Sequence, residues 1–280
     1  MQRRQVGVVK ELRRFPVKSM LGETVSELAI TKTGAAGDRA LALRDLENRR
    51  IVTAKKFAAM LSFRAEWEGE PGSSPSPRIR ITLPGGQVIH ADDPGASEAI
   101  SAALSHRVQL ERAPHPNGER AGIDPRTVFG DVPIGNVIPG MTPEAAPDFF
   151  NLSQGTFFDS AAIHLLATGT LEHMSRIVPG SVFDPRRFRV NIVVDTGAEA
   201  SGFVEDGWLK GTLEVGDGVK IAGMKPALRC VMTTHPQENL SRDMAVLRAA
   251  VQHHSANLGI FASVDSPGGV RIGDPVFLVG

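Results

Sequence analysis

The chain has 280 residues, enough for two domains or one large one, and its 31 lysines and arginines balance its 31 aspartates and glutamates. This zero formal net charge lacks the basic excess typical of nucleic-acid-binding proteins, and the single cysteine excludes an internal disulfide and an iron–sulfur cluster held by the chain's own thiolates. No segment reaches the ~20 apolar residues of a membrane span, and the first residues lack a signal-peptide pattern. We therefore expect a cytoplasmic protein with neither a nucleic-acid nor a membrane partner.

Short strands are predicted throughout the first part of the chain. The clearest signal is a hairpin, because residues 78–83 alternate polar and apolar side chains, residues 84–87 (Pro-Gly-Gly-Gln) form a turn, and a second apolar segment follows at 88–90. A short helix is predicted over residues 96–104. The other predicted strands span residues 6–12, 25–30 and 39–43.

A stretch rich in proline and glycine at residues 112–147 separates this part from the next. We place a domain boundary near residue 115, which gives domains at 1–115 and 116–280. The second part continues with strands and a few helices. Strands are predicted at 162–167, 187–194, 212–215, 219–222 and 228–234, helices at 170–178 and 242–253, and a closing hairpin at 259–264 and 270–279. This spacing predicts a mixed, β-rich α+β protein built on barrels or a sandwich.

The predicted strand at residues 187–194 would carry polar groups on one face. Successive side chains of a strand point to opposite faces, so Arg187, Arg189 and Asn191 would lie together, opposite an apolar face. Guanidinium groups suit bidentate contact with phosphate, and an amide can both donate and accept toward a heterocycle. The alternative is a solvated strand face whose cations pair with Asp184 or Asp195.

Cys230 follows Arg229 and precedes two threonines, Thr233 and Thr234. A neighbouring cation favours the thiolate, which is a nucleophile and a soft metal ligand. The alternative is that Cys230 is a small buried hydrophobic residue.

Two loops near the N-terminus present polar groups. Lys18 and Ser19 follow Phe15-Pro-Val, and Arg39 follows Gly-Asp. Either could be an ordinary surface loop. Glu205 and Asp206 precede Trp208 and fit a structural cluster or the rim of a pocket better than an acid–base pair.

Together, five segments resemble the MOSC family, named after the C-terminal domain of molybdenum-cofactor sulfurase. They occur in the family's order, and the resemblance covers nearly the whole chain, including the N-terminal β-barrel domain that often precedes MOSC. The segments are Phe-Pro-Val-Lys-Ser (15–19), Gly-Asp-Arg (37–39), Arg-Phe-Arg-Val-Asn (187–191), Glu-Asp-Gly-Trp (205–208) and Arg-Cys-x-x-Thr-Thr (229–234).

The resemblance implies an N-terminal β-barrel-like domain followed by a MOSC β-barrel with a few helices. It implies a molybdenum cofactor, with molybdenum bound to a molybdopterin. Cys230 would ligate molybdenum or carry sulfur, and Lys18, Arg39 and Arg189 would converge in space. The implied cofactor-binding residues are Lys18, Ser19 and Arg39 at the pterin phosphate, Arg187, Arg189 and Asn191 toward the pterin, Arg229 beside the metal ligand, and Thr168 and Thr170 in a turn that opens a helix onto the cofactor.

The chain departs from the family pattern at three places, so the resemblance does not define the substrate pocket. Phe15 stands where the family usually has tyrosine, and Val190 stands where it often has proline. After the two threonines, His235-Pro-Gln-Glu-Asn replaces an acid–proline pattern.

The function that the resemblance implies is reduction of N–O bonds in N-hydroxylated compounds, as in amidoxime-reducing molybdenum enzymes. The alternative is a sulfur or cofactor carrier that uses a Cys230 persulfide or thiolate without turnover of its own. The chain has no Walker loop, Rossmann fingerprint or haem attachment motif, so we expect electrons from a partner protein, a flavin or ferredoxin-type reductase.

Overall fold

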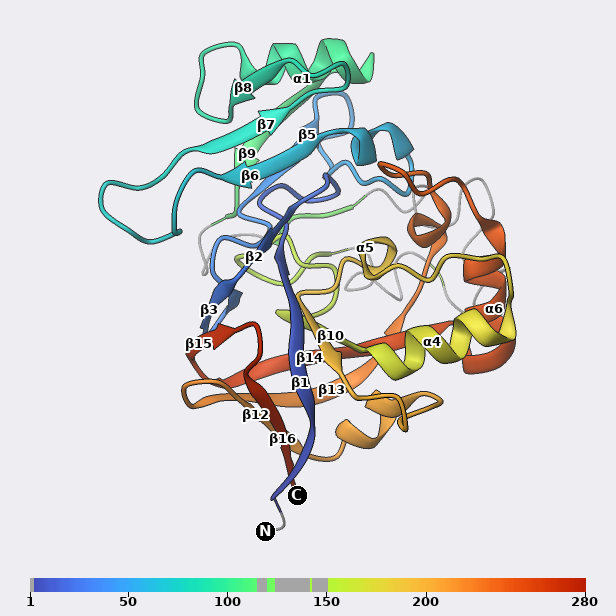
Figure 1. Ribbon diagram of the computed structural model, residues 1–280. Coiled ribbons are helices and arrows are strands. Elements are labelled where there is room, and N and C mark those ends of the chain that lie inside the picture. The colour runs from blue at the N-terminus through green and yellow to red at the C-terminus, as the bar shows by residue number, and fades with distance from the viewer. Residues whose placement is uncertain (1–2, 115–119, 124–141, 143–150) are drawn as a thin grey trace. The chain divides into compact units, whose positions relative to one another are not determined.

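The computed structural model describes residues 3–114, 120–123, 142 and 151–280 (Figure 1). The chain forms two compact units. The first, here called the barrel unit, comprises Met1–Arg14, Glu23–Asp38 and Ala161–Gly280; the second, the inserted unit, comprises Phe15–Gly22 and Arg39–Ser160. Thus the units interleave along the sequence instead of following one another, and the boundary expected near residue 115 lies outside the described residues.

Seven strands of the barrel unit form a closed β-barrel. Closure comes from β1, which pairs with β16 on one side and with β11 on the other, so that the sheet returns to its first strand. Only β10 and β11 run parallel; the remaining pairs of the barrel are antiparallel. The strands are β1 (Arg3–Arg14), β10 (Ile163–Ala167), β11 (Ile192–Asp195), β12 (Thr212–Val215), β13 (Val219–Leu228), β14 (Asn257–Ser266) and β16 (Pro275–Val279), and β2 (Glu23–Val25) extends the sheet beside β1.

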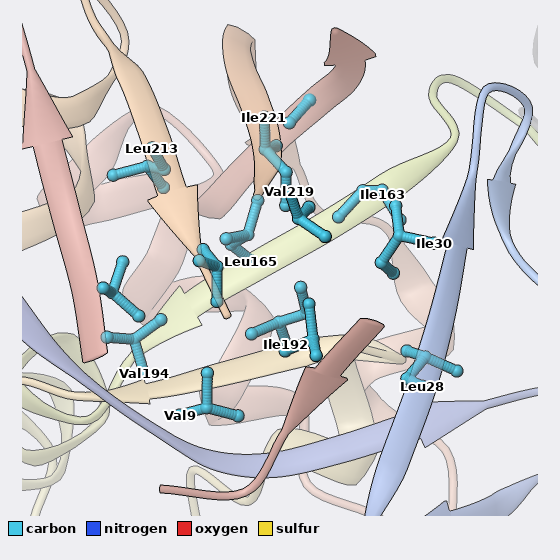
Figure 2. Packing of buried hydrophobic residues seen from close by; sticks show 14 of the residues in the cluster. Val9, Leu28, Ile30, Ile163, Leu165, Ile192, Val194, Leu213, Val219 and Ile221 are labelled. Atoms are coloured by element: carbon cyan, nitrogen blue, oxygen red, sulfur yellow. The ribbon is translucent and has the colours of Figure 1, made fainter. Parts of the chain in front are cut away.

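Apolar side chains from these strands fill the barrel (Figure 2). Val9, Leu165, Ile192 and Val194 come from three different strands and meet in the interior, where each is at most 1% exposed. Burying one such side chain contributes about 1.5–3 kcal/mol, so the interior is a main source of stability.

The strand β10 is buried along its whole length because both of its faces pack against apolar groups. Ile163, Leu165 and Ala167 face the barrel interior, whereas Leu166 belongs to a second cluster that packs with helices outside the barrel. These helices are α4 (Thr168–Ile177), α5 (Pro185–Phe188) and α6 (Met244–His254). The barrel unit also contains the three-stranded sheet β15 (Gly268–Arg271), β3 (Glu27–Thr31) and β4 (Gly34–Ala35), and the 3-10 helices η3 (Val204–Trp208) and η4 (Val231–Thr234).

The inserted unit contains two small sheets and one α-helix among its described residues. The predicted hairpin is confirmed, with Ile81 opposite Ile89, and so is the helix α1, whose bounds are those predicted. The elements are β5 (Leu41–Asp45) paired with β9 (Val108–Arg112), the sheet of β6 (Arg64–Trp67), β7 (Ile79–Thr82) and β8 (Val88–His90), η1 (Ala58–Ser62) and α1 (Ala96–Leu104).

The β-rich α+β class predicted from the sequence is confirmed. The predicted closing hairpin is wrong, although its strands exist. β14 pairs with β10 and β13, β15 pairs with β3, and β16 pairs with β1 and β12. Each of these segments therefore finds its partner far away in the sequence. In the described part of the chain, no helix is long and apolar enough to cross a membrane.

Candidate functional site

Cys230 lies at the turn where β13 ends and η4 begins. The predicted strand at 228–234 is wrong beyond Leu228, because the chain turns into a 3-10 helix over Val231–Thr234. The hydroxyl of Thr233 donates to the carbonyl of Cys230 at 3.0 Å, and that of Thr234 donates to the carbonyl of Val231 at 2.8 Å. Such local bonds compete with sheet pairing. As a result, Cys230 is only partly covered, which disfavours its interpretation as a core residue.

Arg229 holds its guanidinium in a fixed position beside Cys230. Its Nε donates to the carbonyl of Ala227 at 2.7 Å and its Nη1 to the carbonyl of Phe188 at 3.2 Å. The guanidinium also lies over the ring of Phe261, 5.4 Å from its centre. Its Nη2 is fully covered and has no hydrogen-bond partner among the residues that the structure describes. Burial lowers the pKa of Arg229 to about 10, against the opposing attraction of Cys230.

Arg187 is buried and binds the backbone of the turn that follows Cys230. Its buried guanidinium donates to backbone carbonyls: to Val182 at 3.0 Å, to Thr233 and His235 at 3.3 Å each, and to Ser241 at 2.8 Å. Two of these acceptors, Thr233 and His235, lie in or directly after η4. Arg187 therefore fixes the segment that follows Cys230.

The predicted strand over 187–194 is wrong in its first half. Asp184 caps a short helix, with Pro185 at its first position, and Arg189 ends it in a left-handed conformation with φ of 55°. Strand β11 begins only at Ile192. The polar face expected for Arg187, Arg189 and Asn191 therefore does not exist as a strand face.

Asn191 joins three segments of the barrel unit. Its Oδ1 accepts from the backbone N–H of His164 at 3.1 Å, and its Nδ2 donates to the carbonyl of Arg13 at 3.3 Å and to Asp38 Oδ2 at 3.0 Å. Asp38 belongs to the Gly-Asp-Arg segment (37–39), in which only Arg39 was expected to bind the cofactor. Two of the five matching segments thus meet through an amide–carboxylate contact that the sequence did not reveal.

Thr168 and Thr170 lie in the first turn of α4, as the expected turn implies. Both are buried. Thr168 Oγ1 donates to Asp195 Oδ1 at 3.3 Å, and the hydroxyl of Thr170 bonds to the carboxyl group of Glu205. The backbone N–H of Gly169 donates to Thr196 Oγ1 at 3.2 Å. The start of this helix is therefore occupied by acceptors from the chain itself.

Glu205 is a buried carboxyl group, only 1% exposed. Burial raises its pKa to about 7, although the hydroxyl of Thr170 opposes this shift. Its second oxygen, Oε1, finds no hydrogen-bond partner within the described part of the chain. The sequence indicated that Glu205 belongs to a structural cluster or to the rim of a pocket. Its burial could not be predicted, because a neighbouring acidic residue, Asp206, is typical of an exposed segment.

Lys18, Ser19 and Arg39 lie in the inserted unit. The buried Nζ of Lys18 is 2.8 Å from the carbonyl of Phe157 and 2.8 Å from Asp159 Oδ2. Burial lowers the pKa of Lys18 to about 8, with Asp159 opposing the shift. Ser19 is buried as well, and both Ser19 and Arg39 adopt left-handed backbone conformations.

Two further charged residues join Lys18 and Arg39. Lys55 Nζ is 3.8 Å from Asp159 Oδ1. Burial alone would raise the pKa of Asp159, but Lys18, Lys55 and Arg39 together hold it below its ordinary value. Neither Lys55 nor Asp159 lies in one of the five segments that resemble the family. Because Arg189 belongs to the other unit, the convergence of Lys18, Arg39 and Arg189 stays a prediction.

Comparison with known proteins identifies the family. The model of the MOSC domain matches residues 153–277, and that of the MOSC N-terminal beta barrel domain matches residues 6–115. The chain belongs to the MOSC family, and the resemblance seen in the sequence is confirmed.

One relative of known activity is similar over nearly the whole chain. It is the mitochondrial amidoxime-reducing component 1 of Mus musculus, 24% identical over 302 residues, which cover 99% of this chain and 83% of the relative. Among solved structures, the YUAD protein from Bacillus subtilis has a TM-score of 0.48 at 12% identity, covering 99% of this chain and 97% of that one. YiiM from Geobacillus stearothermophilus scores 0.33 at 18% identity, covering 43% and 55%. Neither score reaches 0.5, and we infer no function from these two structures.

Proposed function

We propose that this protein binds a molybdenum cofactor through Cys230 and reduces N–O bonds of N-hydroxylated compounds. The observation that carries the proposal is the turn at Cys230, where a partly exposed thiol stands beside Arg229, a fixed cation with a covered and unpartnered donor. The similarity to an amidoxime-reducing protein supports the reaction class.

The donor set at the turn fits such a cofactor. In the described ranges of the chain, no group of three His, Cys, Asp or Glu residues could hold a metal ion by itself. A single thiolate suits a metal whose other ligands come from a bound cofactor, and thiolate is a soft ligand. The unpartnered Nη2 of Arg229 fits an acceptor atom of a ligand, because a buried donor without a partner is unfavourable.

The residues of the chain would share the work of binding. Cys230 supplies the thiolate, and Arg229 offers a donor next to it. In the inserted unit, Lys18, Ser19 and Arg39 would bind the phosphate group, while Arg189 and Asn191 of the barrel unit would lie toward the pterin. The supporting residues are Arg187, which holds the segment after Cys230, and Thr168 and Thr170, which fix the start of α4. The bound cofactor would supply two-electron redox chemistry.

We further propose that turnover needs a partner protein. Converting an N-hydroxyl group to N–H and water consumes two electrons and two protons. Because no nicotinamide, flavin or haem motif occurs in the sequence, a flavin or ferredoxin-type reductase would supply the electrons. Cofactor-loaded protein should reduce an amidoxime with an artificial low-potential donor, but not with NADH or NADPH alone. Turnover with a nicotinamide and no second protein would contradict this.

The test of the metal ligand is Cys230→Ser, with Met232→Leu in the same turn as a matched control. Serine replaces a soft sulfur with a harder oxygen, so the variant should lose most of its molybdenum and its activity while keeping its stability. Molybdenum and pterin are measured after expression in a cofactor-competent host. Full molybdenum loading of Cys230→Ser would contradict the proposal, and the control should load like the parent.

A second candidate function is that of a sulfur or cofactor carrier. The partly exposed Cys230 thiol beside a cation also suits a persulfide. Mass spectrometry of the intact protein distinguishes the two. A carrier would show an added sulfur on Cys230 without stoichiometric molybdenum, or would hand the cofactor to an acceptor without reducing amidoximes.

A further inference from the structure

Glu205 is a buried carboxyl group to which the proposed function gives no role. It lies in η3 and is 1% exposed, and this burial raises its pKa to about 7. Its oxygen Oε2 contacts the hydroxyl of Thr170, whereas Oε1 has no hydrogen-bond partner in the described part of the chain. A charged carboxylate is costly in such a position, so the neutral acid is the favoured form.

The hydrogen bonds of Thr170 indicate that Glu205 carries the proton. Thr170 Oγ1 accepts from the backbone N–H of Val204 at 3.2 Å and lies 3.1 Å from the carbonyl of Gly202, which is an acceptor only. A hydroxyl has one proton, so if Thr170 donates to Gly202, its contact with Glu205 needs a proton on the carboxyl group. A protonated Glu205 therefore satisfies all three contacts. When Glu205 ionises, the Thr170 hydroxyl can turn its proton from Gly202 to the carboxylate, which is the contact that opposes the rise in pKa.

The C-terminal end of α6 connects η3 with Arg229. His254 Nε2 is 2.8 Å from Asp206 Oδ2, next to Glu205 in η3. Two residues after His254, the carbonyl of Ala256 accepts from the backbone N–H of Arg229 at 2.7 Å. Glu205 and Arg229 lie close enough to act on each other electrostatically, because Glu205 opposes the lowering of the Arg229 pKa. A negative charge on Glu205 would therefore arise near a fixed cation.

Glu205 and Arg229 each keep one buried polar atom in reserve. Oε1 of Glu205 and Nη2 of Arg229 both lack a hydrogen-bond partner among the residues that the structure describes. A bonded guanidinium would hold the carboxyl group in its ionised form, whereas a cation that is near but not bonded only stabilises the charge once it has formed. The arrangement therefore suits an acid that releases its proton and takes it up again.

We propose that Glu205 is the proton-holding residue of the site at Cys230 and delivers one of the two protons that reduction of an N–O bond consumes. The inference rests on the proposed function for the reaction. In that reaction the N–O bond breaks, an N–H bond forms and the oxygen leaves as water, with two electrons from a flavin or ferredoxin-type reductase. The O–H bond of Glu205 breaks and its proton goes to the leaving oxygen. Solvent supplies the second proton and afterwards protonates Glu205 again.

The groups around Glu205 determine how it titrates. The neighbouring charge of Asp206 opposes its ionisation, and Arg229 favours it. Helix η3 also packs against β10, β14 and α4. The titratable residues of these elements are His164 on β10, Asp265 on β14, and Glu172, His173 and Arg176 on α4. The side chain of Glu172 is 52% exposed, so Glu172→Gln is a matched control for Glu205→Gln.

Infrared spectroscopy of the full chain, purified without cofactor, tests whether Glu205 holds a proton. Between about pH 6 and pH 9 the parent should lose the carbonyl band of a protonated carboxyl group, with a midpoint of about 7. Glu205→Gln should lack this change, and Glu172→Gln should keep it. Arg229→Gln removes the nearby cation and should move the midpoint to higher pH by about 1 unit. A parent without a titrating band, or an unchanged midpoint in Arg229→Gln, overturns the inference.

Kinetics of the molybdenum-loaded protein test the delivery of the proton. With an artificial low-potential donor, Glu205→Gln should load molybdenum and pterin like the parent and keep its KM. Its kcat should fall at least about a hundredfold, since general acid catalysis contributes about 10²–10⁴-fold. The kcat of the parent should decrease as the pH rises through about 7, because the acid form of Glu205 is lost, and Glu205→Gln should lack this decrease. Glu205→Asp keeps a carboxyl group and should recover part of the rate.

The outcomes separate the inference from the proposed function. If the parent loads molybdenum and reduces amidoximes, and Glu205→Gln has the same kcat and pH profile, the inference alone is overturned. If the parent binds no molybdenum, the proposed function fails and the delivery of the proton fails with it, while the infrared result on cofactor-free protein remains. Should Glu205→Gln fail to fold, the infrared midpoints of the parent and of Arg229→Gln decide.

Discussion

Lys18 in the inserted unit and Arg229 in the barrel unit are both cations whose pKa is lowered by burial, yet they are held in different ways. Lys18 is paired with the side-chain carboxylate of Asp159, which is half exposed. Arg229 is bound by the backbone carbonyls of Ala227 and Phe188, which cannot move without the chain. The Asp159 partner of the first cation is a side chain, whereas the partners of the second cation belong to the backbone. Substitutions near Lys18 should therefore change ligand affinity, whereas loss of the side-chain to backbone bonds that Arg187 and Arg229 make should also change stability.

The largest expected effect is that of Arg187→Met in the support of the Cys230 turn. The change leaves four backbone carbonyls without their buried donor, and breaking such a network lowers the free energy of unfolding by about 3–5 kcal/mol. Urea denaturation measures it. Arg176→Met on the exposed side of α4 is the control and should change stability by less than about 1 kcal/mol. A similarly small effect of Arg187→Met would remove the contrast between the two regions.

Glu205→Gln should change the pH dependence of stability. The folded pKa of Glu205 is about 7, above its ordinary value of 4.5, so its contribution is fully present below about pH 4.5 and is lost as the pH rises through 7. The parent should lose about 2–3 kcal/mol from this group between pH 5 and pH 8, and Glu205→Gln should not. Urea denaturation at both pH values tests this, with the exposed Glu172→Gln as control. If the free energy of unfolding depends on pH equally in the parent and in Glu205→Gln, the pKa of Glu205 is not raised by folding.

Arg189→Ala should weaken retention of the cofactor. Loss of one charge-assisted contact costs about 1.5–3 kcal/mol, or roughly ten- to hundredfold in affinity. Pterin content after gel filtration measures retention, and thermal unfolding of the cofactor-free protein checks that the fold is kept. Retention equal to that of the parent would remove Arg189 from the predicted group of converging cations.

The smallest effect on stability is expected for Lys18→Met. The folded pKa of Lys18, about 8, lies below its ordinary value of 10.5, so the charged form is disfavoured by folding below about pH 8, and this penalty disappears as the pH rises toward 10.5. Methionine removes this penalty together with the ion pair, and the remaining Asp159 carboxylate, 46% exposed, keeps its contact with water and with Lys55, so losing Lys18 costs less than breaking a fully buried pair. Unfolding at pH 7 should change by no more than about 1 kcal/mol. A loss as large as that of Arg187→Met would mean that Lys18 is a structural anchor as well.

Local patterns predicted several elements correctly. Alternating polar and apolar side chains around a glycine turn were enough to predict β7 and β8. The periodic spacing of apolar residues was enough to predict α1 and α6. The strand expected over 187–194 failed because Asp184-Pro185, a helix-start signal, outweighs the alternation that follows it. The interleaving of the units could not be predicted, because the pairing of β1 with β11 and β16 depends on contacts between distant residues.

The candidate site likewise combines residues that local motifs indicate with residues that only contacts between distant positions bring together. The motifs select Cys230, Arg229 and Lys18 as candidates, since these residues lie in segments that resemble the family, and their role in a site stays a prediction. Lys55 and Asp159 were missed because their ion pair joins positions far apart in the sequence, with no local pattern at either one.

The position of β1 in the barrel has a consequence for synthesis on the ribosome. This strand is made long before its partners β11 and β16, which emerge only after the whole inserted unit. At roughly 5–20 residues per second, β1 waits about 15–50 s for Pro275–Val279. During that time the edge of β1 that pairs with β16 has no partner, although β2 and later β11 can already pair with β1, and Val9 and Leu12 have no closed barrel to enter. We expect nascent chains stalled before residue 275 to bind chaperones through this strand, and release of the full chain to end that binding.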